Sequence, residues 1–457
     1  MVMGSVTVGI FGGVFAVAVM NGAIEQRVDS ALSYEIAHIH INDPGFRDNY
    51  DIQLTIPDLE KVTGALSETE EVVAVARRII ISGMANTATK SAGVQIMGVD
   101  PAQDKEVFDL HEQTIPGTGD FFETESRFNL AYIGQELAKE LNIIRYIIDD
   151  EMIQKLRDNE VPAETLNKLS DFKGERFHSE DDFEKQMKEA LSEKEQNEYG
   201  RAIKEQAWSF SERSRMTLTF LDKDQTQTGA VFRIAGIYDI SNNAFEMSRV
   251  FVKKELLSGL TGLGENQVHQ LTVRLEDMDQ AQSVSSELSE KFPGLEILSW
   301  KDIQPDLAYM TDLVTNFYAV FMIIILAALA FGIVNTMLMV VLERTKELGM
   351  LTAIGMNKKR VFSMIMLESI FLSLTGGALG MIVSQLLIMF TSNRGIRFSQ
   401  FEEGFEALGY SSHIYPDINP GFFLTVTALI ILTGILSSIY PAVKALKLDP
   451  AEALRTE

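Results

Sequence analysis

The chain has 457 residues and a formal net charge of −24, with 40 lysine and arginine residues against 64 aspartate and glutamate residues. This balance argues against a nucleic-acid partner, because neutralising phosphates requires clustered basic residues. The absence of cysteine excludes disulfides, cysteine-ligated zinc, iron–sulfur clusters and thiol catalysis. Charged residues crowd the middle of the chain and are nearly missing from four apolar stretches.

The first apolar stretch, residues 1–22, contains no charged residue and predicts a transmembrane helix, which needs about 20 residues. The alternative is a cleaved signal peptide. Two features weaken it, since no lysine or arginine precedes the apolar run and no small-x-small cleavage site ends it. The missing basic flank is also unusual for a membrane anchor, which leaves open a native start upstream of Met1.

Three further apolar stretches each predict a transmembrane helix. Residues 313–342 are uncharged and would measure about 45 Å as a helix, so this span either tilts or projects from the membrane as a stalk. Residues 361–392 contain one charged residue, Glu368, and residues 418–443 contain none.

Basic residues near the span ends predict the orientation, because short loops rich in lysine and arginine stay in the cytoplasm. The link 343–360 and the tail 444–457 carry such residues, namely Arg344, Lys346, Lys358, Lys359, Arg360, Lys444, Lys447 and Arg455. Residues 23–312 and the loop 393–417 are therefore expected outside. The sequence predicts a multi-pass protein of the inner (plasma) membrane with its large domain extracytoplasmic.

The outer region, residues 23–312, has the mixed pattern of an α+β domain. Short runs rich in β-branched residues, bounded by glycine, asparagine and aspartate, predict strands. The predicted strands are 37–42, 72–81, 93–99, 215–221, 231–238, 268–275 and 295–300. A helix is expected over 278–292. The overall class is four transmembrane α-helices with a large α+β extracytoplasmic domain between spans one and two.

Residues 145–212 differ from the rest of the outer region because they are highly charged and lack strand signals. Helical spacing, as in the helix 179–191 with Ser179 as its cap, predicts a helical insertion. Its sparse apolar residues predict helices packed loosely on the outer domain. Solvated local helices and a partner-docking module both remain open.

No catalytic constellation is recognisable, since the sequence has neither a GxSxG nor an HExxH motif. A GxxxxGK[ST] phosphate-binding loop is also missing, so ATP hydrolysis is expected on another polypeptide. The pair His38 and His40 could face one way on a strand, but a metal site needs further ligands and none is evident. We expect neither enzyme activity nor a cofactor on this chain.

The link after the second span predicts an amphipathic helix followed by a basic turn. Leu348, Leu351 and Ile354 are expected on one face, and Gly349 and Gly355 would permit close backbone approach. A generic basic segment at the membrane surface is the alternative.

The amino-acid sequence of this link, ERTKELGMLTAIGMNKKRV, resembles the segment after the second span in MacB/FtsX-like ABC transporter permeases. This family includes the lipoprotein-releasing permeases, which the chain resembles most, and the macrolide exporter. The matching positions are Glu343, Arg344, Glu347, Gly349, Leu351, Ala353 and Gly355, while Leu348 and Val361 stand where the family often has isoleucine. The segments 130–142, 299–307 and 440–455 are similar to family segments too.

The resemblance implies a dimer with a second copy or a paralogue, and two ABC-type ATPase subunits in the cytoplasm that bind ATP and magnesium. Motion driven by ATP would pass along the spans to the outer domain, which would act on a lipoprotein, another extracytoplasmic partner or an amphiphile such as a peptide or macrolide. Lipoprotein release or translocation is the expected activity. The alternatives are a regulator of cell-wall hydrolases and a sensor or adhesin without any ATPase.

The resemblance also implies that the link docks on the ATPase. The expected coupling residues are Glu343, Arg344, Glu347, Leu348, Gly349, Leu351, Ala353, Ile354 and Gly355. Glu368, the ionisable residue in span three, is expected either to pair with Lys358, Lys359 or Arg360 or to act directly in transport.

Overall fold

The computed structural model describes residues 2–124, 126–158, 161–177, 180–210 and 214–446. The chain forms two compact units. We call the first, Met1–Val28, Asp306–Glu402 and Ser411–Glu457, the helical unit. The second, Asp29–Pro305 with Glu403–Tyr410, is called the sheet unit.

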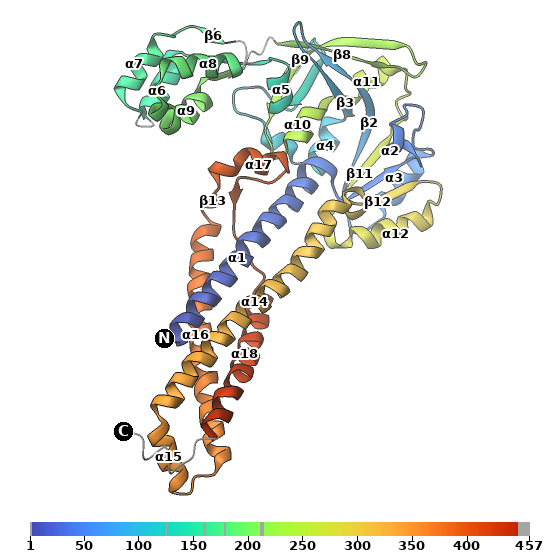
Figure 1. Cartoon of the computed structure of the whole chain (residues 1–457). Coiled ribbons are helices and arrows are strands. Elements are labelled where there is room, and N and C mark those ends of the chain that lie inside the picture. Colours follow the sequence, from blue (N-terminus) through green and yellow to red (C-terminus); the bar gives the residue numbers. More distant parts are fainter. Residues whose placement is uncertain (1, 125, 159–160, 178–179, 211–213, 447–457) are drawn as a thin grey trace. The chain divides into compact units, whose positions relative to one another are not determined.

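Four helices of the helical unit are long and apolar enough to cross a membrane, which confirms the predicted fold class (Figure 1). They are α1 Val2–Ser30, α14 Pro305–Glu343, α16 Lys358–Ser392 and α18 Pro420–Leu446. Two of them extend far beyond the apolar runs. Helix α1 continues past residue 22, and α14 begins before residue 313 and spans about 58 Å. The reason is that charged residues end an apolar run without breaking a helix.

Small residues bring these helices close together. A Cβ atom added at Gly380 of α16 would lie 2.7 Å from the carbonyl oxygen of Thr7 in α1, and one at Gly377 would lie 2.7 Å from Ile430 of α18. The hydroxyl of Ser384 donates to the carbonyl of Phe11 at 2.9 Å. Glycine and serine therefore let α16 pack against both α1 and α18, as small residues commonly do in membrane helices.

The sheet unit contains a nine-stranded sheet in the order β12-β1-β11-β2-β3-β10-β4-β9-β8. The strand β2 is 15 residues long, and its two halves have different partners. Its first half pairs with β11, and its last residues pair with β8, which closes β2, β3, β10, β4, β9 and β8 into a ring. The bounds are β1 Ile39–Asn42, β2 Val72–Asn86, β3 Ser91–Val99, β4 Leu130–Gly134, β8 Arg215–Leu221, β9 Gln227–Tyr238, β10 Arg249–Lys253, β11 Gln270–Leu275 and β12 Glu296–Ser299.

Short helices accompany the strands of this sheet, and short elements also occur in the loop after α16. Those of the sheet unit are α2 Phe46–Asn49, α3 Leu59–Ser67, α4 Pro101–Val107, α5 Gln135–Glu140, α10 Asn243–Ser248, α11 Lys254–Thr261, α12 Ala281–Lys291 and α13 Trp300–Ile303. The loop after α16 holds β13 Ile396–Arg397, α17 Glu402–Ala407 and β14 His413–Ile414. The predicted helix 278–292 is a 3₁₀ turn followed by α12.

A buried ion pair joins the sheet to α4. Arg78 of β2 donates from Nε and Nη2 to Oδ1 of Asp104 at 2.9 and 2.7 Å. Its guanidinium also stacks over the ring of Phe108, 3.9 Å from the centroid. Both charged side chains lie in the aromatic core of the sheet unit, so each depends on the other for its charge compensation.

The histidines near β1 contact β11 rather than each other. Nδ1 of His38 accepts from the backbone N–H of Leu275 at 2.8 Å, and Nδ1 of His40 lies 3.1 Å from Nε2 of Gln270. Nε2 of His40 is buried without a hydrogen-bond partner. Among the described residues, no group of three or more histidines or carboxylates could hold a metal ion.

The predicted helices of 145–212 are present, but the segment also contains strands, which the sequence did not indicate. The segment forms a compact insertion with a three-stranded sheet in the order β6-β5-β7. Its elements are β5 Ile144–Ile147, α6 Asp150–Asp158, α7 Ala163–Ser170, β6 Arg176–Phe177, α8 Glu180–Ala190, α9 Glu193–Ala207 and β7 Trp208–Phe210. The strands are two to four residues long, too short for an alternating pattern to show in the sequence. Ser179, the expected cap of α8, and residues 211–212 lie outside the described residues.

The insertion has its own hydrophobic core. The few apolar residues of its helices recur every three or four positions and therefore converge on one interior. These buried residues are Tyr146, Ile148, Met152, Ile153, Leu156, Val161, Leu166, Leu169, Phe177, Phe183, Met187, Leu191, Ile203 and Ala207. A core therefore forms from few apolar residues, because their placement rather than their number decides whether they meet.

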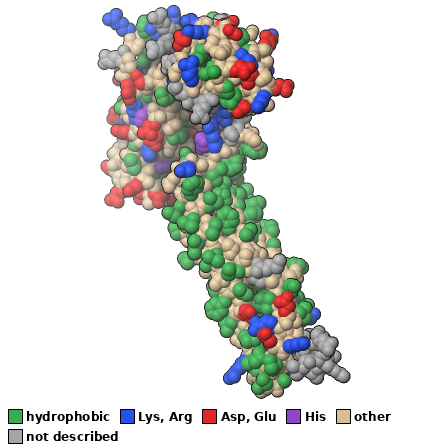
Figure 2. Space-filling view, turned by 90° about the vertical axis from the view of Figure 1, so that its left-hand side faces the viewer, with side chains coloured by type: hydrophobic (Ala, Val, Ile, Leu, Met, Phe, Trp, Pro, Cys, Tyr) green, Lys and Arg blue, Asp and Glu red, His purple; other side chains and the backbone are tan. Residues whose placement is uncertain are grey.

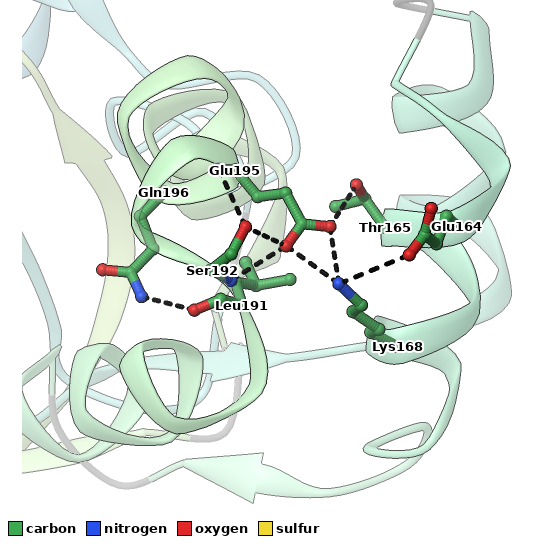
Figure 3. Close-up of polar contacts among 7 residues, drawn as sticks. All are labelled: Glu164, Thr165, Lys168, Leu191, Ser192, Glu195 and Gln196. Carbon is green, nitrogen blue, oxygen red and sulfur yellow. Dashed lines mark hydrogen bonds and ion pairs between the residues drawn. The ribbon is translucent and has the colours of Figure 1, made fainter.

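A polar cluster ties α7 to α9 in the insertion (Figure 3). Ser192 and Glu195 form a capping box at the start of α9. The Glu195 carboxylate also accepts hydrogen bonds from the Thr165 hydroxyl at 3.0 Å and from Lys168 Nζ at 2.9 Å. The hydrogen bond from the Ser192 hydroxyl, followed by that from Lys168, lowers the pKa of Glu195 to about 2.

We expect that residues 144–210 can be replaced by a short glycine–serine linker without unfolding the rest of the chain. The two ends of the insertion meet, because Ile144 of β5 pairs directly with Phe210 of β7, and the insertion has a separate core. Hydrogen exchange in the full-length variant should leave β2 and β3 as protected as in the parent chain. As a control, excising 130–140 should remove that protection, since β4 belongs to the closed ring. Lost protection in the insertion variant would contradict the prediction.

Candidate coupling site

The candidate site is a helical hairpin corner between α14 and α16. Helix α14 ends at Glu343, Arg344 leaves the helical conformation, and α15 follows over Thr345–Ala353. Helix α16 then begins at Lys358, where the side chain of Asn357 accepts from the backbone N–H of Lys359 at 2.9 Å. The corner is therefore a short helix held between two spans by defined turns.

The structure of this corner explains why residue 355 is a glycine. Its φ of +98° lies in the left-handed region, where side chains with a Cβ are strained. The N–H of Met356 bonds to the carbonyl of Leu351, and that of Gly355 bonds to Thr352, which is the Schellman end of a helix. A Cβ at residue 355 would meet no atom within 4 Å. The turn itself requires this glycine, whatever its part in close approach to a partner.

The apolar face expected through Leu348, Leu351 and Ile354 is divided. Leu348 is only 5% exposed and packs in the core of the helical unit, and Gly349 is buried beside it. Leu351 is half-buried, whereas Ala353 and Ile354 are exposed. Residues 348 and 354 are six positions apart, which places them roughly 120° apart around a helix. Leu348 therefore anchors α15 and is not available for a partner.

Sequence reasoning missed Met350, which is 51% exposed, as a member of the outward face. Ile354 is 78% exposed and lies four positions later, so the two side chains neighbour each other on the helix surface. The i, i+4 spacing of two apolar residues was visible in the sequence. An exposed apolar pair among charged residues is the surface of this corner that fits a partner best.

Glu368 pairs with Arg344 rather than with the basic residues 358–360. Nη1 of Arg344 donates to both carboxylate oxygens of Glu368 at 3.3 Å, and its Nε donates to Glu347 at 2.8 Å. Residues 358–360 lie on the same helix as Glu368 but about 12–15 Å away along its axis, which is too far for a direct contact. The pairing expected from sequence proximity was therefore wrong.

Charged side chains gather at this end of the helical unit. Figure 2 shows the unit as a column of hydrophobic side chains that ends in a group of acidic and basic ones. Lys346, Glu347, Lys358, Lys359 and Arg360 are all exposed, and so is Glu343. The corner thus combines a basic surface with the apolar pair Met350 and Ile354.

Comparison with known families finds a match within the helical unit. Residues 319–450 match the model of the FtsX-like permease C-terminal domain. This part of the chain is similar to FtsX-like permeases. The match covers most of α14 and all of α15, α16 and α18, so it includes the whole coupling corner. The four long apolar helices of the chain fit the predicted multi-pass membrane protein.

Similar curated proteins include the macrolide export ATP-binding/permease protein MacB of Escherichia coli (strain K12), which is 30% identical over 234 residues. The corresponding protein of Shigella flexneri is 31% identical over the same length. Each alignment covers 49% of this chain and 34% of the relative. The chain thus spans about a third of the length of the curated relatives it matches.

Similar solved structures include two outer domains. The extracellular domain of the noncanonical ABC-type transporter YknZ from Gram-positive bacteria gives a TM-score of 0.29 at 11% identity, over 57% of this chain and 98% of that chain. The periplasmic region of MacB from Actinobacillus actinomycetemcomitans gives 0.28 at 10% identity, over 62% and 98%. These TM-scores are too low to support an argument about the fold. The fold is therefore defined by the strands and helices of this chain alone.

The other segments that resemble the family form defined structural elements. In 130–142, β4 leads into α5, and a Cβ at Gly134 would lie 2.6 Å from Glu246. The buried Glu246 carboxylate accepts from the backbone N–H of Glu136 at the start of α5. In the segment 299–307, Ser299 forms a capping box for α13. In 440–455, Pro441, Ala442 and Ala445 are buried in α18, and residues 447–455 lie outside the described residues.

Proposed function

We propose that this chain is the permease subunit of an ABC transporter and relays ATP-driven motion from a separate ATPase to its outer domain. The observation that carries the proposal is the exposed pair Met350 and Ile354 on α15, flanked by exposed basic residues at a cytoplasmic corner. ATP and magnesium would be bound by the ATPase, since residues 1–457 contain no phosphate-binding loop motif. A dimer with a second copy or a paralogue is part of this proposal.

For the substrate, we propose release or translocation of a lipoprotein. Export of an amphiphile such as a macrolide is equally consistent, because the relatives are named for macrolide export. In both cases the outer domain would act on the cargo, which agrees with the single charged residue, Glu368, in the four predicted spans. A regulator of cell-wall hydrolases remains the other candidate. Mass spectrometry of what co-purifies with the outer domain of the intact protein would separate them.

Ile354→Asp and Met350→Asp are each expected to abolish co-purification of the ATPase and its stimulation. Burial of the introduced carboxylate against the ATPase would cost several kcal/mol, so association should weaken at least about a hundredfold. The expected readout is the amount of ATPase bound to the purified permease in lipid nanodiscs, together with its rate of ATP hydrolysis.

The matched control is Leu408→Asp. Leu408 is 72% exposed, close to the exposure of Ile354, but it lies in the loop between α16 and α18 at the opposite end of the spans. That variant should keep full association. If the aspartates at 350 and 354 also keep full association and activity, α15 is only a membrane-surface helix and the coupling proposal fails.

A further inference from the structure

One guanidinium connects three helices at the coupling corner. Arg344 lies at the non-helical junction between α14 and α15, and it bonds to Glu347 of α15 and to Glu368 of α16. Its distances are 2.8 Å to Glu347 and 3.3 Å to both oxygens of Glu368. A movement of α15 relative to α16 therefore either breaks the ion pair between Arg344 and Glu368 or moves Glu368 along with α15.

The surroundings of the ion pair strengthen it. Met337, Val341, Leu348 and Ile365 line the apolar side of the small cleft where the pair lies. An exposed ion pair in water contributes little to stability. A carboxylate inside a membrane helix is different, because leaving it without a partner is costly. Glu368 therefore holds Arg344 more firmly than the partly exposed geometry alone would suggest.

Few other contacts fix α15. The helix has nine residues, fewer than an isolated helix needs to be stable in water. Its buried anchor is Leu348, together with Gly349, while most of its other side chains are exposed or half-buried. Helix α16, in contrast, packs closely on α1 and α18 through Gly376, Gly377 and Gly380. The ion pair thus joins a weakly held helix to a firmly held one.

We propose that Arg344 and Glu368 are positioning residues that fix α15 to α16, so that a displacement of α15 by the ATPase is delivered to α16 and α18. This inference rests on the proposed function for the ATPase step. The role of the ion pair in fixing α15 to α16 does not depend on the proposed function.

The holding role can be measured on the permease alone in lipid nanodiscs. The chain has no cysteine, so Met350→Cys gives a single site for a nitroxide spin label. Glu368→Gln and Arg344→Gln should each increase the mobility of the label. The double variant should be no more mobile than Arg344→Gln alone, because that single variant already removes the contact between Arg344 and Glu368. Lys346→Gln, which removes an exposed charge on the same helix, is the matched control and should leave the mobility unchanged. Unchanged mobility in Glu368→Gln would overturn the inference.

The delivery of motion is measured with the ATPase present. A label at Met389, which is exposed on α16, should change its spectrum when ATP is added, and Glu368→Gln should lose this response while it still binds the ATPase. A retained response in Glu368→Gln would overturn the delivery role. If the parent permease binds no ATPase, the proposed function fails, and the mobility of the label at residue 350 still decides the holding role.

Discussion

Asp104→Ala is expected to lower the free energy of unfolding of the sheet unit by about 3–5 kcal/mol. Arg78 is 1% exposed and has Asp104 as its ion-pair partner in the aromatic core, so the substitution leaves a buried cation uncompensated. Burial raises the pKa of Asp104, and the Arg78 guanidinium offsets part of that rise. The shift of the urea midpoint for the full-length protein in nanodiscs, followed by hydrogen exchange of β2 peptides, measures the loss.

The double variant Arg78→Met, Asp104→Leu separates the ion pair from the packing around it. Replacing both charges by apolar side chains of similar volume is often neutral, so most of the stability should return. A loss below about 1 kcal/mol for Asp104→Ala would mean that the pair behaves like an exposed one. It would then not be a structural link between β2 and α4.

The sheet unit is expected to lose stability steeply in acid because of His40. Burial, reinforced by Arg47 and Arg78, lowers the pKa of His40 from 6.5 to about 3. Below pH 6.5 the unfolded chain binds a proton that the folded chain does not, so stability is full above pH 6.5 and falls as the pH decreases toward 3. The slope is about 1.4 kcal/mol per pH unit, which amounts to about 2 kcal/mol at pH 5. Burial lowers the pKa of His38 and His269 as well, in the same direction.

Urea midpoints of the sheet unit at pH 7.5 and pH 5.0 test this expectation in the full-length protein. His40→Gln removes the titrating group and should reduce the difference between the free energies of unfolding at the two pH values by about 2 kcal/mol. His413→Gln, in the loop of the helical unit, is the control and should leave the difference as it is. An unchanged difference in His40→Gln would show that His40 does not titrate on unfolding.

The features that sequence predicted well are those encoded in local patterns. Four apolar runs gave the four long helices, and β-branched runs such as 72–81 gave strands of the sheet. The features it missed depend on neighbours distant in the sequence. Arg344 reaches Glu368 because the corner brings the end of α14 next to α16, and no spacing along the chain encodes that pairing. Leu348 likewise appeared free because its packing partners lie on other helices.

The closed ring of strands in the sheet unit limits how another protein can bind to it. Because β8 pairs with both β9 and β2, the described nine-stranded sheet has one free edge, the four-residue strand β12. Short edges give a poor template for adding a foreign strand, which also protects against aggregation. A partner of the outer domain is therefore expected to recognise side-chain surfaces or the insertion, rather than to extend the sheet by backbone hydrogen bonds.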